Sequence, residues 1–400
     1  MSNTLKVIDM VAKEALRIAH EKATFVSTIN RSYDDSFAKT GAKIGSTLRV
    51  RDPNQYTRRQ GSRVMDVQDQ DESTQTITVA TQDGVDMRFN SAELALNVDD
   101  PSAVDLFSKR FIEPAMSVLI SGIDGDCITT ATKDTWNLVG TPGTVVGASS
   151  DITALGQARA KLNQNLAPKD MNRAIQLDSI TMASIVNGNK ALFLPDNQIK
   201  KAFTEGFYSR SAMADFYENE RTYSHTNGAD HTSVTINDTL ASGDTTVTTA
   251  GATVTVGTVF TFDGCYDVHP ETKASYSHLK QFVVTAVSGN DWTFAPAIIT
   301  SGAKQNASAL PTNGATITCV GSASTSYRHN LMYHQDAFTF VTADLPLMDD
   351  AHKCVRKTMD GLSLRVWMAS DIRNDELLMR LDILYGFKSL RPQWACRITN

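Results

Sequence analysis

Residues 49–64 read RVRDPNQYTRRQGSRV and place five arginines within sixteen positions: Arg49, Arg51, Arg58, Arg59 and Arg63. The whole chain of 400 residues carries 44 acidic and 38 basic side chains, which gives a net charge of −6. A net acidic chain disfavours nucleic acid or an anionic membrane as the main partner, because phosphate binding needs clustered lysines and arginines that nearby carboxylates do not compensate. The arginine-rich stretch therefore needs a different explanation.

Strand patterns flank this stretch on both sides. Leu48 and Val50 alternate with Arg49 and Arg51, and residues 73–89 (STQTITVATQDGVDMRF) repeat apolar side chains at alternate positions. Such alternation predicts strands with one half-buried face. The segment between them, residues 52–74, holds almost no core-forming side chains and is long for a hairpin loop in a compact domain. It is either disordered or an arm that becomes ordered against another molecule.

The order of charges in this segment favours a neighbouring copy of the same protein. The arginines are followed by the acidic run DVQDQDE, residues 66–72. Its carboxylates would repel the phosphates of a nucleic acid, whereas two copies meeting head to tail can match positive to negative charge and so fix their register. A solvated loop with locally balanced charge is the alternative. We interpret the charged residues of the arm as inter-subunit contacts: Arg49, Arg51, Arg58, Arg59, Arg63, Asp66, Asp69 and Asp71.

A long helix is predicted after the arm. In NVDDPSAVDLF, residues 97–107, Asp100 can cap the helix and Pro101 suits its first position. Apolar residues then recur at helical spacing to about Ala131, and Pro114 inside the pattern predicts a kink in this helix. A helix of roughly 30 residues is about 45 Å long, which suits a strut better than a small globular core.

The rest of the chain changes composition twice. A Gly-rich linker over 137–150 precedes a mixed α+β segment, with helices near 151–164 and 179–187 and a strand in RAIQLD. Residues 233–322 are rich in threonine, contain three basic residues and break into short alternating runs between turn signals. This pattern predicts an all-β barrel or sandwich of about six strands. Because α+β patterns lie on both sides of it, we interpret it as a domain inserted into another.

The cysteines and the N-terminus indicate a reducing compartment. The N-terminal stretch, in which an amphipathic helix is predicted over 4–22, lacks the uninterrupted apolar core of a signal peptide. No apolar run approaches the length of a membrane span. We therefore expect a cytosolic protein with no membrane partner. The five cysteines are far apart, form no CxxC pair and suit small core residues better than a disulfide framework: Cys127, Cys265, Cys319, Cys354 and Cys396.

Motifs of well-defined chemistry are missing from the sequence. It contains no GxGxxG, GxSxG or HExxH motif and no phosphate-binding P-loop. The histidine pairs 225/231 and 329/334 do not share a helical face, so loop or interior histidines are expected rather than metal ligands. IDGDC, residues 123–127, misplaces the glycine and glutamate of a calcium loop, and a helix-end turn is predicted there. We predict no enzymatic activity, no cofactor and no metal.

The order of these parts resembles the tailed-phage major capsid proteins of the Hong Kong 97 fold. It is most similar to the coat proteins of the P-twenty-two-like short-tailed phages, which carry an inserted β domain. RSYDDSFAKTGAKIGSTLRVRDPNQY, TVATQDGVDMRFNSAEL and FSKRFIEPAMSVL resemble the arm, extended loop and spine helix of that family. NLMYHQDAFTFVTADLPL and the final LDILYGFKSLRPQWACRI resemble its closing segments. The resemblance covers most of the chain and is most specific over 30–130 and 325–400.

This resemblance implies an α+β fold of the Hong Kong 97 type with an inserted all-β barrel domain. Its parts would be an N-terminal arm, an extended β-hairpin loop, a spine helix with a peripheral domain, an axial domain in two parts, the inserted barrel, and closing strands. The corresponding ranges are 1–45, 46–90, 91–195, 196–232 with 323–350, 233–322, and 351–400.

The function that the resemblance implies is that of a major capsid protein. Its copies would assemble into pentamers and hexamers of an icosahedral shell around the double-stranded DNA genome of a tailed bacteriophage. The extended loop would lie over an adjacent subunit, with its arginines facing carboxylates of neighbouring copies. A scaffolding protein and a portal are expected partners, DNA is expected only as non-specific contents, and assembly is expected in the cytoplasm of the host bacterium before the shell becomes the virion capsid.

Two other functions stay open at this level. A cellular nanocompartment shell of the same fold would enclose an enzyme cargo instead of DNA. A carbohydrate-binding phage surface protein would stack sugars on aromatic side chains of the barrel, for which Trp292, Tyr266 and Tyr276 are the candidates. An enzyme has no motif in its favour.

Overall fold

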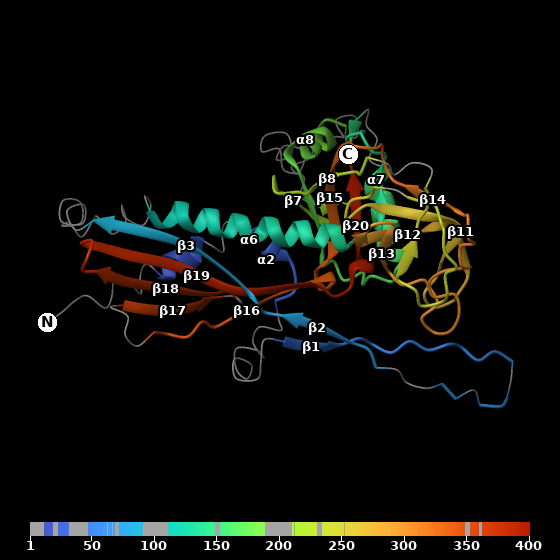
Figure 1. Cartoon of the computed structure of the whole chain (residues 1–400), viewed down its shortest axis with the longest axis horizontal. Helices are drawn as coiled ribbons and strands as arrows, with labels where there is room; N and C mark the ends of the chain where they lie inside the picture. Colours follow the sequence, from blue (N-terminus) through green and yellow to red (C-terminus); the bar gives the residue numbers. More distant parts are fainter. Residues whose placement is uncertain are drawn as a thin grey trace. The chain divides into compact units, whose positions relative to one another are not determined.

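The computed structural model of the chain groups the residues into two compact units, which we describe separately. Unit 1 contains residues 1–50, 75–127 and 338–388, and unit 2 contains residues 51–74, 128–337 and 389–400. Figure 1 labels the elements by the names used below. The structure describes residues 12–18, 23–31, 47–61, 63–65, 67–68, 72–90, 111–148, 153–188, 210–211, 213–229, 234–251, 253–348, 353–359 and 362–400.

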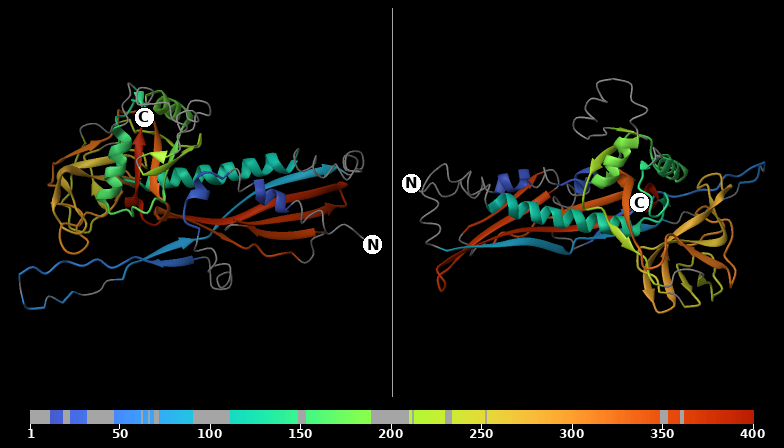
Figure 2. Two further views of the ribbon diagram at one scale, coloured as in Figure 1. Left: turned by 180° about the vertical axis from the view of Figure 1, so that it is seen from behind. Right: turned by 90° about the horizontal axis from the view of Figure 1, so that it is seen from above.

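Unit 1 is built on a sheet with the strand order β16-β19-β18-β17, in which β3 also pairs with β19. The antiparallel register of β3 and β19 runs from Glu376 opposite Asn90 to Tyr385 opposite Thr81. Figures 1 and 2 show these two long strands side by side, β3 in light blue and β19 in red. The strands are β3 (Thr81–Asn90), β16 (Phe338–Ala343), β17 (Lys353–Met359), β18 (Leu362–Asp371) and β19 (Glu376–Ser389).

Gly84 of β3 lies against a buried ion pair of this sheet. A Cβ atom added there would lie 2.7 Å from Oδ1 of Asp382, so the strand needs glycine at this point. Asp382 is fully buried and accepts a 2.7 Å hydrogen bond from Arg365 and a 2.9 Å bond from Arg380. Both carboxylate oxygens are therefore paired, which a charge in the interior of a sheet requires.

The long helix of the chain, α6, spans Glu113–Asp134. Its buried positions recur at steps of three and four residues, as at Met116, Ile120, Ile123 and Cys127. IDGDC therefore lies inside a continuous helix, and the predicted helix-end turn is wrong. The glycine does not stop the helix because helical backbone is among the conformations open to glycine, at a cost of only about 0.5–1 kcal/mol relative to alanine.

Pro114 is the second residue of α6, where its missing N–H costs nothing. Phe111 and Ile112 directly before the helix have π-helical backbone. The predicted part of the helix over 101–110 lies outside the described residues, so the kink at Pro114 stays a prediction. Of the helix predicted over 4–22, the structure describes residues 12–18, which are helical.

A separate two-stranded sheet pairs β1 (Thr47–Arg51) with β2 (Thr74–Thr78). Within the predicted hairpin over 46–90, β1 and β2 pair with each other whereas residues 81–90 pair with β19, and the bounds of the hairpin stay a prediction. The reason lies in the side chains of β3: Phe89 is buried and Val85 and Met87 alternate with polar residues, so the strand needs a sheet to cover one face. We call residues 47–78 the arm.

Unit 2 contains a sheet with the order β4-β20-β15-β5-β7-β6, and β8 also pairs with β15. Apolar residues of this sheet, such as Ile175 and Ile398, form one core with Leu155 and Leu162 of α7. The elements are β4 (Leu138–Val139), α7 (Thr153–Gln164), β5 (Arg173–Leu177), α8 (Ser179–Gly188), β6 (Arg210–Ser211), β7 (Ala214–Glu218), β8 (Ser224–Thr226), β15 (Ser326–His334), the short 3-10 helices η4 (Gln335–Ala337) and η5 (Pro392–Trp394), and β20 (Ala395–Thr399).

The predicted spine and peripheral domain over 91–195 has residues in both units, and its bounds stay a prediction. Residues 128–188 belong to unit 2, because β5 pairs with β15 and with β7. The closing segment 351–400 is likewise divided between the units at residues 388 and 389. Local patterns predicted these helices and strands, but their grouping depends on pairings between segments that are far apart in the sequence.

Residues 234–319 form a second sheet of unit 2 with the order β10-β13-β12-β11-β14-β9. A bridge between Ile236 and Thr249 joins its two outer strands, so the six strands close into a barrel. Its core is aromatic and includes Trp292, which is fully buried, with its ring 5.8 Å from that of Phe260. The strands are β9 (Val234–Thr235), β10 (Thr246–Thr248), β11 (Val259–Val268), β12 (Ser275–Ser288), β13 (Asp291–Ala295) and β14 (Thr316–Cys319).

A glycine in β19 provides a test of the packing in unit 1. A Cβ atom at Gly386 would lie 2.4 Å from the carbonyl oxygen of Thr78 and 3.0 Å from Cα of Val79. Both are backbone atoms, which cannot move aside as a flexible side chain would. We therefore expect Gly386→Ala to lower the free energy of unfolding of the unassembled subunit by about 1–3 kcal/mol, the usual cost of overpacking, as measured by urea denaturation.

Gly122 of α6 supplies the matched control, because a Cβ atom there would meet nothing within 4 Å. Gly122→Ala should leave the subunit as stable as the wild type or up to about 1 kcal/mol more stable, since alanine is the better helix former. Equal urea midpoints for Gly386→Ala and the wild type would contradict the close crossing of the chain at Thr78 and Val79.

Candidate assembly interface

The arm is an extended loop held by a small number of internal hydrogen bonds. Beyond the β1–β2 pairing, the Asp52 N–H donates to the Ser73 carbonyl at 3.0 Å. Further out, the side chain of Gln68 replaces a strand partner: its Oε1 accepts from the Thr57 N–H at 2.8 Å and its Nε2 donates to the Thr57 carbonyl at 2.7 Å. Figure 1 shows this part of the chain, in blue, as a long loop with little regular structure.

All five arginines of the arm are exposed. Arg51 lies 3.7 Å from the carboxylate of Glu72, with 78% and 59% of the two side chains exposed, and such an exposed ion pair contributes little stability. Arg58 donates to Gln60 at 3.0 Å, and Arg59 donates to the carbonyl of Val64. Asp66, Asp69 and Asp71 lie outside the described residues. The arginines thus remain accessible to carboxylates of another molecule.

The same arm exposes apolar side chains. Tyr56 is 55% exposed, and Val64, Met65 and Val67 are between 76% and 79% exposed. Burying a large aliphatic side chain stabilises a protein by about 1.5–3 kcal/mol, so a cluster of this kind left in water is a substantial loss for an isolated chain. Contiguous exposed apolar residues rimmed by charge are typical of protein–protein contacts. The charges of the arm were predicted from the sequence and these apolar residues were not, although MDV at residues 65–67, where the acidic run begins, was a usable signal.

A second exposed surface follows α6. The residues of its outward face are spaced four apart, at Pro114, Val118, Gly122, Asp126 and Thr130. Val118 is 69% exposed, and a Cβ atom at Gly122 would meet nothing within the chain. Another chain could approach the helix backbone closely along this face.

Asp124 on the inward face of α6 fixes the N-terminal segment of unit 1. This fully buried carboxylate accepts hydrogen bonds of 2.9 Å from the backbone N–H groups of Phe25 and Val26, and one of 2.8 Å from the hydroxyl of Thr24. It thereby caps the short helix α2 (Phe25–Thr28), whose first N–H groups have no partner within the helix. No sequence pattern indicated this contact between residues about a hundred positions apart.

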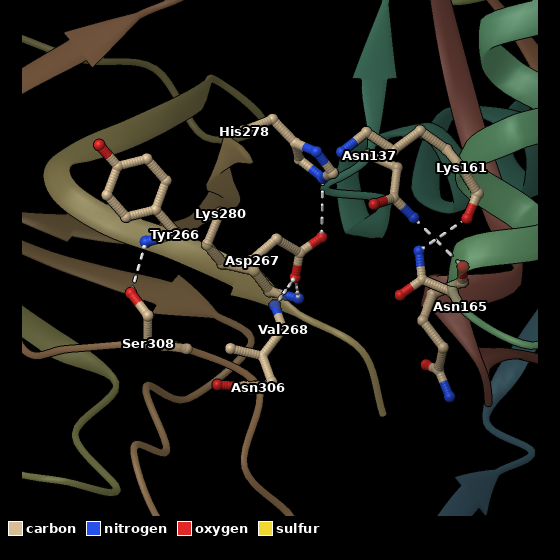
Figure 3. Close-up of polar contacts among 12 residues, drawn as sticks. Asn137, Lys161, Asn165, Tyr266, Asp267, Val268, His278, Lys280, Asn306 and Ser308 are labelled. Carbon is tan, nitrogen blue, oxygen red and sulfur yellow. Dashed lines mark hydrogen bonds and ion pairs between the residues drawn. The ribbon is translucent and has the colours of Figure 1, made fainter. Parts of the chain in front are cut away.

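The barrel contains a buried ion pair near α7 (Figure 3). The carboxylate of Asp267 accepts a 2.8 Å hydrogen bond from the ammonium group of Lys280, and the two residues are only 5% and 6% exposed. Its other oxygen lies 3.3 Å from Nε2 of His278. Burial by itself would raise the pKa of Asp267, but the hydrogen bond from His278 and the charge and hydrogen bond of Lys280 lower it to about 2. Burial lowers the pKa of Lys161 on α7, and the charge of Asp267 opposes this effect.

The histidines that are neighbours in the structure are not those that are closest in the sequence. His231 lies outside the described residues, and His225 instead meets His329, with ring centroids 5.8 Å apart. His334 is an interior histidine that contacts the carboxylate of Asp170 at 2.9 Å. Within the described ranges, no group of three or more His, Cys, Asp or Glu side chains is placed to hold a metal ion.

The thiols lack the features of a nucleophile. None of the five cysteines forms a disulfide. Burial raises the pKa of Cys265 to about 11 and that of Cys319 and Cys396 to about 12. The pKa of Cys127 is also raised, by burial and then by the charge of Asp124. A reactive cysteine needs the opposite shift, so these side chains act as small core residues. Separately, none of the helices within the described residues combines the length and apolar composition of a membrane span.

Comparisons with known proteins relate the chain to phage coat proteins. The family model described as "P22 coat protein - gene protein 5" matches residues 219–397. A structure from Mycobacterium phage Che8 superposes with a TM-score of 0.50 at 9% identity, covering 94% of this chain and 90% of that chain. The capsid structure of cyanophage P-SCSP1u gives a TM-score of 0.45 at 13% identity, covering 88% and 83%. The coat protein I-domain of CUS-3 is 26% identical, with a TM-score of 0.19, and covers 22% of this chain and 96% of that chain. No curated protein sequence matches the chain.

The ion pair of the barrel yields a test of its packing. Asp267→Asn would leave Lys280 buried beside a neutral amide, and removing one partner of a buried pair costs about 3–5 kcal/mol. Combining Asp267→Asn with Lys280→Met removes both charges and should recover most of the lost free energy of unfolding. Urea denaturation of the unassembled subunits measures both values. If the double variant were no more stable than the single one, the pair would not be the cause of the loss.

The pH dependence of this pair has a defined sign. The folded-state pKa of Asp267 is about 2, against an ordinary value of 3.8, so the folded chain binds this proton less readily than the unfolded chain. The stabilisation is therefore complete above pH 3.8 and is lost as the pH falls toward 2, by about 2 kcal/mol. The wild type should lose more stability over this range than the double variant.

Proposed function

We propose that this chain, a tailed-phage major capsid protein of the P22 and Hong Kong 97-like type, builds its icosahedral shell by laying the arm of each copy over a neighbouring copy. The family match over residues 219–397 and the fold are the premises of this proposal. The predicted α+β capsid fold is confirmed. Proteins of this family and fold are structural proteins, and many copies of one chain assemble into the capsid of a virion.

The observation that carries the proposal is the composition of the arm surface. Four large apolar side chains, Tyr56, Val64, Met65 and Val67, are more than half exposed beside the five exposed arginines. Within the subunit, neither the apolar side chains nor the arginines are buried. A second copy can cover the apolar residues and offer carboxylates to the arginines, because the chain as a whole is acidic. Val118 and the outward face of α6 are a suitable receiving surface on that copy.

The finer features of the shell follow the same proposal. We place the subunits in pentamers and hexamers around double-stranded DNA, with a scaffolding protein and a portal as partners and assembly in the host cytoplasm. A net charge of −6 suits a shell that encloses DNA without adhering to it. We also propose that the barrel over residues 233–322 is a domain inserted between the two parts of the axial domain.

The carbohydrate-binding alternative loses one of its three aromatic residues. Trp292 is fully buried in the barrel core, and its indole is therefore inaccessible to a sugar. Tyr266 is 42% exposed and Tyr276 is half-buried, so two of the three candidate aromatic side chains remain at the surface. A nanocompartment shell would share the arm contact, and it differs in its contents: an enzyme cargo would co-purify with such shells and DNA packaging would not occur.

Electron microscopy tests the proposed function. The protein is expressed alone and then together with the products of its neighbouring genes, and particles are examined by negative staining. We expect closed polyhedral shells, or sheets and spirals that become shells when the scaffolding protein is present. A uniform monomer or dimer under both conditions would rule out a shell protein.

Charge reversal tests the arginines of the arm. Arg58→Glu with Arg59→Glu should leave the subunit folded, because both side chains are exposed, but should reduce the yield of closed shells at least tenfold. Arg58→Lys with Arg59→Lys keeps the charge and is the matched control. The wild-type contact should also weaken at high salt, which screens exposed charges. Normal shells from the reversed variant would show that these charges are incidental.

A companion variant separates apolar contact from charge. Met65→Ser with Val67→Ser removes exposed apolar surface from the arm without changing its charge. We expect this variant to assemble poorly at low and high salt alike, since burial of apolar surface is not screened. Unchanged sedimentation of its shells in both buffers would contradict a role for these side chains in the contact.

A further inference from the structure

A buried polar site joins the barrel to the sheet of unit 2. Gln281 of β12 donates to the Leu138 carbonyl at 2.8 Å and accepts from the Leu138 N–H at 3.0 Å. Beside this contact, the turn before β11 offers the carbonyl of Gly257 to Arg397 of β20. A further contact is an apolar cluster of four buried residues: Trp136, Leu138, Val259 and Val283.

Arg397 holds three elements together. Its side chain is fully buried, and it donates to the Gly257 carbonyl of the barrel at 2.7 Å and to the Lys133 carbonyl at the end of α6 at 2.9 Å. Its Nε has no hydrogen-bond partner among the described residues, and no carboxylate there forms an ion pair with it. Burial lowers the pKa of Arg397 to about 9. This cation is stabilised by carbonyl dipoles, by the C-terminal end of α6 and, without a direct ion pair, by the charge of Asp134.

His329 lies beside this cation. In the β15–β20 ladder His329 is opposite Thr399 and Leu331 is opposite Arg397. Because alternate residues of a strand share a face, His329 and Arg397 are diagonal neighbours on one face, at about 7–8 Å, within reach of a long side chain. His329 is 5% exposed, and its Nδ1 has no partner among the described residues.

His225 connects His329 to the barrel. Its ring lies 5.8 Å from that of His329, its Nε2 is 3.0 Å from the hydroxyl of Thr258, and its Nδ1 is 3.3 Å from the hydroxyl of Tyr223. The backbone N–H of His329 donates to the Tyr223 carbonyl at 2.8 Å. The two histidines thus lie at the point where β8, β15 and the barrel meet.

We propose that His329 is the trigger of a pH-sensitive latch, which holds the barrel on the sheet at neutral pH and releases it in acid. A neutral imidazole fits beside the guanidinium of Arg397. A proton on His329 would add a positive charge to a buried site that already holds Arg397 and lies against His225, and Lys133 of α6 lies over the ring of Tyr223 in the same region. Asp134 is the nearby carboxylate, and it already accepts a 2.6 Å hydrogen bond from Ser389. Opening of the Arg397–Gly257 contact admits water, which solvates both charges.

The direction of the effect follows from linkage. Burial, then the charges of Arg397 and His225, lower the pKa of His329 well below the ordinary 6.5. An opened state binds the proton below pH 6.5 whereas the closed state does not, so the latch has its full strength above this pH. Each pH unit below it weakens the closing equilibrium by up to about tenfold, the effect of one proton.

Hydrogen exchange measured by mass spectrometry tests the latch in the unassembled full-length subunit. Opening constants are measured from pH 7.5 to 5.0 for peptides covering residues 253–262 and 395–399, with intrinsic exchange rates corrected for pH. We expect the wild-type opening constant to rise about tenfold per pH unit below 6.5. His329→Gln, which is polar and cannot be protonated, should lose this rise.

His334→Gln is the matched control. His334 lies in the same strand and is 1% exposed, but it faces the carboxylates of Asp170 at 2.9 Å and Asp336 at 3.9 Å, so a positive charge there is compensated. This variant should keep the wild-type rise. The same rise in His329→Gln as in the wild type would overturn the proposal.

A second measurement on the wild type covers the case in which His329→Gln does not fold. The chain is labelled with ¹³C-histidine, and the ring Cε1 resonances are followed over the same pH range by nuclear magnetic resonance. One histidine, assigned by its loss in a His329→Asn spectrum or by its contacts to Tyr223, should stay neutral down to pH 5.5. Titration of His329 with a midpoint at or above 6.5 would overturn the latch independently of any variant.

Discussion

Much of this architecture depends on the pairing of β8 with β15. Thr226 lies opposite Ser326, one hundred residues further along the chain, and Asn227 donates to the carbonyls of Val320 and Ser322. Closing a loop of this length costs about 4 kcal/mol of chain entropy, which a barrel with its own aromatic core can offset. A domain is accommodated as an insertion when its two ends lie close together. Because β15 continues into pairs with β5 and β20, one strand both joins the two ends of the inserted segment and belongs to the larger sheet of unit 2.

Sequence patterns predicted the local structure well and the long-range structure poorly. Alternating residues around Arg49 predicted β1, apolar residues at helical spacing predicted α7, and the threonine-rich runs predicted the six strands of the barrel. The partners of β5 were beyond reach, because all five of its residues are buried and a fully buried strand carries no pattern that selects its neighbours.

The same limit applies to the polar contacts. Asp124 was predicted to lie in a turn, because its partners, Phe25 and Val26, are about a hundred residues away in the sequence. His225 and His329 were each considered with the nearest histidine in the chain, but the fold brings them to each other. For the arm, the arginines were identified as candidates, and their role as subunit contacts stays a prediction. Its exposed apolar residues became visible only when burial was known.

Charge is distributed differently in the arm and in the interior. In the interior, Asp382 of β19 pairs with Arg365 directly opposite on β18, and Asp267 of β11 pairs with Lys280 of the next strand, β12. Such pairs add little net stability over apolar residues of the same size, but a wrong register leaves a buried charge without its partner and is strongly disfavoured. The interior charges therefore favour the correct pairing, whereas the arginines of the arm stay exposed and play no such part.

The crossing of the chain at Gly386 has a mechanical consequence. Thr78 and Val79 touch the backbone of β19 there, and Ile77 and Val79 are buried, so the base of the arm is clamped. Beyond the clamp, a chain of about twelve residues on each side spans at most about 40 Å when fully extended at 3.3 Å per residue. A lever of this length that pivots at Gly386 moves its tip by about 7 Å, the width of a side chain, when its base rotates by about 10°. Under the proposed arm contact, a shell built from these subunits would therefore convert a small angular change within each subunit into a full exchange of contacts at its neighbour.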